Sequence, residues 1–278
     1  MRPFFVTKDG EPPFQPHRRG SQELSMGMVP MGDQWIDFDT DVAAWKAHKL
    51  EQRELRGDRV YRVLPEALDA AQELSAMIAD LPEVDGAALA SGGIAAEERL
   101  WRASLQVPDD LIIMLPGDDE GYRLVAASLC SPSHWKLPEK IGKPIRRVHD
   151  PIPRVHDTLS PKIDRFFDRI HPDNPVERHN WSIQCPPELF ADSRYDRDAV
   201  PEDAPLFYRA ERQTLRRLPR SNAVAFTIRI YMTPLDDFPE GFGELFAAID
   251  NTPEELAVYK GLPRYTAALK RYRDRQNR

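Results

Sequence analysis

The chain has 278 residues and a formal net charge of −7, from 38 Lys and Arg against 45 Asp and Glu. This acidic balance argues against a protein that coats nucleic acid, and no run approaches the roughly 18 apolar residues that a membrane span needs. The first eight residues lack the apolar stretch of an export signal, and the two cysteines, Cys130 and Cys185, are too few for a disulfide framework or a structural zinc site. We therefore expect a cytoplasmic globular protein.

The first third of the sequence is predicted to be mainly helical. Residues 1–38 are rich in Pro, Gly and Met and show little periodicity, which indicates an extended arm that its Phe and Trp side chains pin to the surface. Asp39 and Thr40 can cap a charged helix over residues 41–56. A second helix is expected over residues 65–81, where apolar side chains recur at helical spacing.

The middle of the sequence changes to β-branched and aromatic runs, which predict an antiparallel sheet. The expected strands are residues 110–115, 122–129, 180–184 and 223–231. Helices are expected between the second and third of these strands, over residues 138–149 and 160–170, the latter capped by Ser160.

The end of the sequence returns to helix. Thr252 is expected to cap a helix with Pro253 at its first position, and Gly261 to end it before a last helix. We therefore predict an α+β fold, a sheet with flanking helices. We expect one globular unit, which the sequence divides into an N-terminal arm and helical extension, a core and a C-terminal helical segment, over residues 1–90, 91–240 and 241–278.

Three stretches carry more polar residues than is usual for a hydrophobic core, namely residues 130–153, 177–186 and 209–229. No common dinucleotide, phosphate-loop, serine-hydrolase or zinc-protease motif occurs in the chain. The residues left to carry chemistry are therefore His, Cys, Trp and Arg.

Taken together, these stretches resemble the catalytic subunit of the heme-dependent oxidative N-demethylases, the dimethylamine monooxygenase family. The matching motifs run in order from MGMVPMG (residues 26–32) through SPSHW (131–135), EKIGKP (139–144), HDPIP (149–153) and NW (180–181) to ERQTLRRLP (211–219). The resemblance implies a PAS-like core that binds heme b between its antiparallel sheet and flanking helices. It also implies oxidative N-demethylation of a small methylated amine with O2, driven by electrons from an NADPH-dependent flavin/iron–sulfur reductase partner.

The resemblance further implies a histidine ligand for the heme iron, and we predict that it is His149. Histidine is also favourable as a cap at a helix end, and Pro151 would stop a helix there. The rival histidines are His156, His171 and His179. Cys185 is a different rival, because a Cys-Pro pair can supply a thiolate to heme, although a free cysteine is more often a buried apolar residue.

Five arginines occur within residues 209–220, and guanidinium groups can bind the two heme propionates. On a helix, Arg209, Arg212 and Arg216 would share a face, and we predict Arg212 and Arg216 as propionate ligands, with Lys140 and Arg146 as weaker candidates. The alternative is a solvated basic face or a docking patch for an acidic redox partner.

Aromatic faces and a carboxylate can hold a methylated ammonium group near the heme. We assign this catalytic role to Trp181 and Glu139, and we expect Trp135 beside the cofactor. Each Trp could instead belong to the core, and Glu139 could be an ordinary acid in the first turn of a helix.

Two alternative functions remain open. A heme-binding PAS sensor would bind a gas or respond to redox state without turnover. An oxygenase of the same family could act on a different nitrogen-containing substrate.

Overall fold

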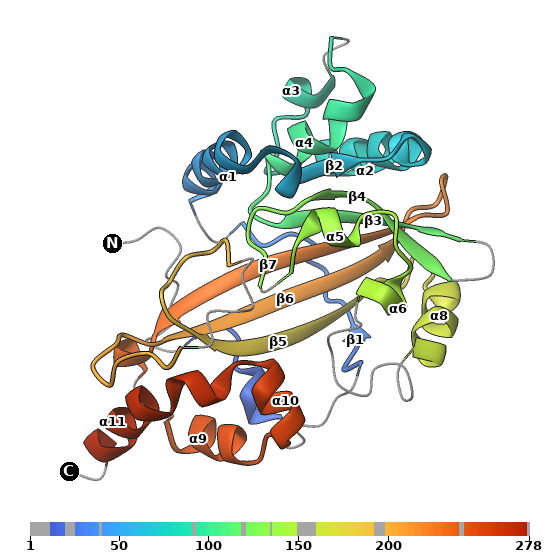
Figure 1. Cartoon of the computed structure of the whole chain (residues 1–278). Helices are drawn as coiled ribbons and strands as arrows, with labels where there is room; N and C mark the ends of the chain where they lie inside the picture. Colours follow the sequence, from blue (N-terminus) through green and yellow to red (C-terminus); the bar gives the residue numbers. More distant parts are fainter. Residues whose placement is uncertain are drawn as a thin grey trace.

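The computed structural model describes residues 12–19, 26–38, 41–90, 93–117, 121–133, 135–148, 160–191, 198–238 and 242–276. Within these ranges, the centre of the molecule is a seven-stranded antiparallel sheet with strand order β1-β5-β6-β7-β3-β4-β2 (Figure 1). Its strands are β1 (Val29–Pro30), β2 (Tyr61–Val63), β3 (Asp110–Pro116), β4 (Tyr122–Ser128), β5 (Val176–Gln184), β6 (Phe207–Arg217) and β7 (Val224–Pro234).

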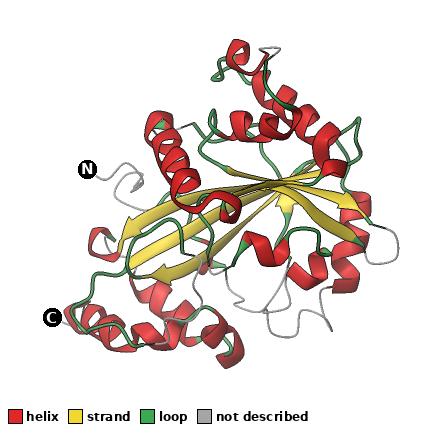
Figure 2. Cartoon of the chain, turned by 45° about the horizontal axis from the view of Figure 1, so that its top comes forward, coloured by secondary structure: helices red, strands yellow, loops and turns green. Residues whose placement is uncertain are grey.

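Helices lie on both faces of this sheet, so the predicted α+β class is confirmed (Figure 2). They are α1 (Val42–Arg56), α2 (Leu68–Ala79), α3 (Gly86–Ala90), α4 (Arg99–Ser104), α5 (Leu137–Lys140), α6 (Ile145–Val148), α8 (Ser160–Arg169), α9 (Phe242–Asp250), α10 (Glu254–Tyr259) and α11 (Thr266–Gln276). None of the helices in the described ranges is both long enough and apolar enough to cross a bilayer.

Side chains alternate between the two faces of each strand, so the strand register defines which residues share a face. We call the face that carries Tyr208, Ala210 and Arg212 of β6 the first face. Helices α2 and α4 cover its half over β2–β4, and α9 and α11 cover its half over β5–β7. The C-terminal side chains buried there include Tyr265, Leu269 and Tyr272.

The second face carries Arg209, Glu211 and Gln213 of β6. Ile112, Ile228 and Ile230 pack there against Leu137 of α5, and Leu215 and Val224 pack against Ile163 and Phe167 of α8. This face is therefore covered by α5, which leads into the EKIGKP motif, and by α8.

Helix α1 is fastened to the core by a buried ammonium group. Lys49 is fully buried, and its Nζ donates to the carbonyl oxygens of Ser104 at 2.8 Å, Val107 at 3.0 Å and Asp109 at 2.5 Å. Asp41 caps the helix, because its Oδ1 accepts from the Ala44 amide at 3.1 Å. The expected caps Asp39 and Thr40 lie outside the described residues.

Three sequence predictions about the elements need correction. Residues 207–217 form β6, a strand that was not among the expected ones, and its arginines had been considered only for a helix. The single helix expected over residues 138–149 is two short helices, because Gly142 has a positive φ of 77° between α5 and α6. Thr252 does not cap α10, because its hydroxyl donates to the Ala248 carbonyl at 2.7 Å and so belongs to the end of α9.

Candidate functional site

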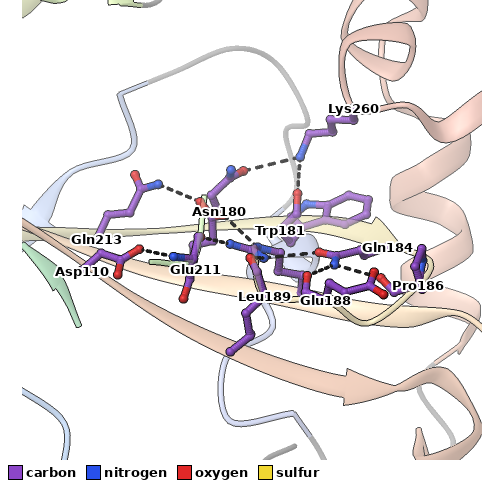
Figure 3. A network of polar contacts seen from close by, with 12 residues as sticks. Asp110, Asn180, Trp181, Gln184, Pro186, Glu188, Leu189, Glu211, Gln213 and Lys260 are labelled. Carbon is purple, nitrogen blue, oxygen red and sulfur yellow. Dashed lines mark hydrogen bonds and ion pairs between the residues drawn. The ribbon is translucent and has the colours of Figure 1, made fainter. Parts of the chain in front are cut away.

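Residues from three motif stretches meet in one hydrogen-bond network on the second face (Figure 3). Its hub is Arg209, which is fully buried. The guanidinium donates to the carbonyl oxygens of Ser131 at 2.6 Å and Leu189 at 3.2 Å, and to Gln184 Oε1 at 3.3 Å. Its Nε donates to Glu211 Oε1 at 3.1 Å. One side chain thus joins the end of β4 to β5, β6 and the loop after β5.

Asp110 and Glu211 supply the carboxylates of this network. Asp110 accepts from the amides of Cys130 at 2.9 Å and Ser131 at 2.8 Å, so it holds the start of the SPSHW stretch against Arg209. Burial raises the pKa of Asp110. The other oxygen of Glu211 accepts from Gln213 Nε2 at 3.0 Å, and the carboxylate is mostly buried.

Lys260 reaches the network from the C-terminal end of α10. Its Nζ donates to the Trp181 carbonyl at 2.6 Å and lies 3.5 Å from Asn180 Oδ1. The ammonium also lies 4.5 Å from the centre of the Trp181 ring, whose plane runs nearly parallel to Tyr208 at 6.0 Å. Burial lowers the pKa of Lys260 to about 8, and the Glu211 carboxylate opposes this shift.

Trp181, predicted to hold an amine, is a buried core side chain whose ring contacts Lys260 and Tyr208. Trp135 is half-buried and packs against the apolar cluster under α5. Glu139 is exposed on α5 and lies 3.5 Å from Lys136 in an ion pair. The structure therefore does not bring Glu139 together with Trp181.

The predicted propionate arginines lie on the first face. Arg212 pairs with Glu177, Nη2 to Oε2 at 2.7 Å, and donates to the carbonyl oxygens of Trp35 at 2.8 Å and Gln34 at 2.7 Å. Its role here is to tie the N-terminal arm to the sheet. The Arg216 guanidinium lies 4.9 Å from the centre of the Trp35 ring, and burial lowers its pKa.

The expectation that Arg209, Arg212 and Arg216 share a face is wrong, because the segment is a strand. Its alternation places Arg209 on the second face and the other two on the first. The alternative of a solvated basic face is also wrong for Arg209, Arg212 and Arg217, which are buried. Among the weaker candidates, Lys140 is buried in α5, and its Nζ lies 3.3 Å from the Arg147 carbonyl.

The predicted iron ligand His149 and its rival His156 lie outside the described residues. His171 is exposed, and its Nδ1 lies 3.4 Å from Asp173. His179 is on the first face, stacked 4.2 Å from Phe14, and burial lowers its pKa to about 4. Within the described ranges, no group of three or more His, Cys, Asp or Glu side chains could hold a metal ion.

The two cysteines differ in their surroundings. Cys130 is buried in the core as expected, and Cys185 is half-buried before a cis peptide bond to Pro186. Burial raises the pKa of both thiols, so both are protonated at neutral pH.

Sequence reasoning missed the roles of Arg209, Glu211 and Lys260. Glu211 is the first residue of the ERQTLRRLP motif, and alternate residues of β5 and β6 line the second face. A search of residues 207–217 for a period of two would therefore have placed Arg209 and Glu211 on one face. Lys260 lies about 50 residues further along the chain, and only the fold brings it to Trp181.

The family model described as haem-dependent oxidative N-demethylase, alpha subunit-like, matches residues 87–270, which is more than half of the chain. The matched span includes the whole network of Figure 3, from Asp110 to Lys260. This chain therefore belongs to the family of heme-dependent oxidative N-demethylase alpha subunit-like proteins.

Proposed function

We propose that this protein is a heme-dependent monooxygenase that oxidatively N-demethylates a small methylated amine such as dimethylamine. The observation that carries the proposal is the convergence of the SPSHW, NW and ERQTLRRLP motifs on one network on the second face. An alpha-subunit-like family is in keeping with further partners, and we propose an NADPH-dependent flavin/iron–sulfur reductase as the source of electrons.

The described residues of the second face fit a heme group. Porphyrin needs apolar walls, and four half-buried apolar side chains lie together on this face: Trp135, Ile141, Val148 and Phe226. Val148 contacts the clusters on both halves of the face and directly precedes His149. We therefore propose His149 as the iron ligand of a heme b in this region.

When bound, heme would supply the activation of O2 and the oxidation of an N-methyl carbon, after which the carbinolamine releases formaldehyde. The protein's own task is to hold the amine and keep water away from it. A protonated amine needs a carboxylate or an aromatic face. Glu211 is a mostly buried carboxylate of the second face with lone pairs beyond its bonds to Arg209 and Gln213, so we propose it for this role beside Glu139. Glu211 takes the place of Trp181, whose ring lies on the first face with Tyr208 and Ala210.

The test combines heme loading with turnover. The purified chain is reconstituted with hemin, titrated with dimethylamine while the Soret band is followed, and then supplied with NADPH, O2 and a flavin/iron–sulfur reductase. We expect one heme per chain, a dimethylamine-dependent Soret change, and formaldehyde in proportion to the oxygen consumed. His149→Ala should lose stable heme, whereas exposed His171→Ala should keep it.

The other outcomes separate the alternatives. Tight O2 binding without formaldehyde from any methylated amine would support a sensor and refute the proposal. Formaldehyde from a larger N-methyl compound but not from dimethylamine would retain the oxygenase and replace the substrate. A His149→Ala variant with full heme and an unchanged spectrum would remove His149 as the ligand.

A further inference from the structure

We propose that Arg178, on the second face of β5, binds a carboxylate group of the cofactor or of the substrate. The residue lies opposite Gln213 in the strand register, and therefore on the same face as Glu211 and the hub Arg209. The cofactor arm of this proposal rests on the proposed heme function, and the substrate arm rests on the same site.

The guanidinium of Arg178, in β5, differs from those of the arginines that are buried in β6. The Arg209 and Arg212 guanidinium groups donate to carbonyl and carboxylate oxygens through all three of their nitrogens. The Nε of Arg178 is also buried, but it has no hydrogen-bond partner among the described residues. A buried N–H donor without an acceptor is costly, so the site suits an acceptor that the described residues do not supply.

The charges around Arg178 point to an anion as that acceptor. Arg19 and Lys260 are the nearby cations, and Glu211 is the carboxylate that opposes them. The two oxygens of Glu211 accept from Arg209 and Gln213, and neither of them accepts from the Arg178 Nε. Glu177, the next acid along the strand, points to the first face and pairs with Arg212. Burial accordingly lowers the pKa of Arg178, as it does that of Lys260.

The geometry favours a carboxylate over a larger anion. A guanidinium presents a planar fork of donors that matches the two oxygens of a carboxylate. The Lys260 ammonium uses two of its three N–H groups on Trp181 and Asn180, which leaves one for the same ligand. A bound carboxylate would reduce the positive charge of Arg178, Arg19 and Lys260, which Glu211 offsets only in part.

Arg178 is also within reach of the proposed heme region. Its register row continues through Gln213 to Ile228 of β7, one pair away from the half-buried Phe226. Adjacent strands are about 4.8 Å apart, so β5 and β7 are separated by about 10 Å. An arginine side chain extended along the sheet toward β7 would cover much of that distance and bring its donors toward a ligand lying on Phe226.

The first experiment compares hemin with hemin dimethyl ester, in which both propionates are methylated. Transfer of each compound from the protein to excess apomyoglobin is timed for the parent and for Arg178→Gln, Arg178→Lys and Arg62→Gln. Arg62 is the matched control, because it is a half-buried strand arginine on β2 at the opposite edge of the sheet. If the ligand is a propionate, the parent should hold hemin at least about 10-fold longer than the ester, the value of one charge-assisted hydrogen bond. Arg178→Gln should abolish this preference, Arg178→Lys should retain part of it, and Arg62→Gln should behave as the parent.

The second experiment tests the substrate as the source. If Arg178 binds a substrate carboxylate, all four proteins should release hemin equally. The affinity for N-methylglycine, measured from the Soret change, should then fall at least about 10-fold in Arg178→Gln, while the affinity for dimethylamine is unchanged.

A third measurement separates this proposal from the proposed function. Propionate is titrated into the heme-free parent and Arg178→Gln by calorimetry, with far-ultraviolet circular dichroism to confirm that both are folded. Propionate binding that is lost in Arg178→Gln supports the carboxylate site even if the parent takes up no heme. If Arg178→Gln matches the parent in every experiment, the proposal is overturned.

Discussion

Arg209 illustrates why a charged side chain can occupy the middle of a sheet. Its burial is tolerated because the guanidinium donates to Glu211, Gln184 and two backbone carbonyl groups, which replace the water that it loses. The same bonds fix the position of the loop that begins at Ser131. The residue thus acts on the candidate site through the loop, because its guanidinium donates to groups of the protein.

We predict that Arg209→Met destabilises the protein by about 3–5 kcal/mol, because it leaves Glu211 buried without its cation. The measurement is urea unfolding at neutral pH. The double variant Arg209→Met, Glu211→Met should be more stable than Arg209→Met alone, because it removes the unpaired charge. Arg62→Met, the matched strand arginine, should lie within about 1 kcal/mol of the parent. A single variant as stable as the parent would contradict this account of the hub.

At the scale of elements, strands with apolar side chains could be predicted and the strand with charged side chains could not. Three of the expected strands correspond to β3, β4 and β7, and the fourth to the second half of β5, because β-branched and aromatic residues dominate them. Strand β6 buries Arg209 and Glu211 on one face and Arg212 on the other, so its pattern has no apolar alternation. Such conflicts between local pattern and fold are expected at functional sites.

The candidate site was predictable to the same extent. The motifs located the right segments, whereas the face on which each side chain lies depended on the secondary structure. Arg212 and Arg216 were therefore predicted as propionate ligands with helical spacing in mind. In the strand, their side chains lie on the opposite face from Arg209. Contacts such as that of Lys260 with Trp181 join residues distant in sequence, and no local pattern encodes them.

The hairpin of β6 and β7 is fastened to α2 by one carboxylate. Glu73 is buried, and its two oxygens accept from the amides of Arg220 and Ser221, each at 2.7 Å. The Arg220 side chain is largely exposed and lies 3.7 Å from the same carboxylate. The stabilisation should therefore come from the backbone amides of the turn and little from the ion pair.

We predict that Glu73→Gln costs about 1.5–3 kcal/mol of stability, since an amide offers one acceptor where the carboxylate offers two charged ones. Arg220→Ala should cost less than about 1 kcal/mol, because the backbone amides remain and an exposed ion pair contributes little. Urea midpoints for the two variants decide the matter. Equal losses would show that the ion pair, and not the turn, is the fastening.

At the scale of the whole molecule, buried neutral histidines couple folding to pH. Burial lowers the pKa of His17, His48 and His179 to about 4, below the ordinary value of 6.5. Between pH 4 and pH 6.5 these histidines are protonated in the unfolded chain but neutral in the folded chain. The contribution of these histidines to the free energy of unfolding is therefore fully present above pH 6.5. It is lost as the pH falls toward 4, by up to about 1.4 kcal/mol per pH unit for each histidine. Asp109, whose pKa burial raises to about 6, acts in the opposite sense.

His48→Gln isolates one of these contributions. Its Nε2 lies 3.0 Å from the Cys130 carbonyl, and a glutamine amide can donate to the same oxygen. We predict that the loss of stability between pH 7 and pH 5 is smaller in this variant than in the parent by about 1–2 kcal/mol. Urea unfolding at both pH values measures it, and the exposed His171→Gln is the control. A variant with the parent's slope would exclude His48 as a source of the pH dependence.

The two outer strands of the sheet both come from the early part of the chain. Strand β1 pairs with Val176 and Glu177 of β5, and β2 pairs with Ala126, Ala127 and Ser128 of β4. During synthesis, residues 29–63 therefore leave the ribosome well before either of their pairing partners exists. Their backbone groups must wait, hydrated or held by chaperones, until more than a hundred further residues have been made to provide both partners. Strands β1 and β2 are thus made early, and they can pair only after β5 and β4 have followed them.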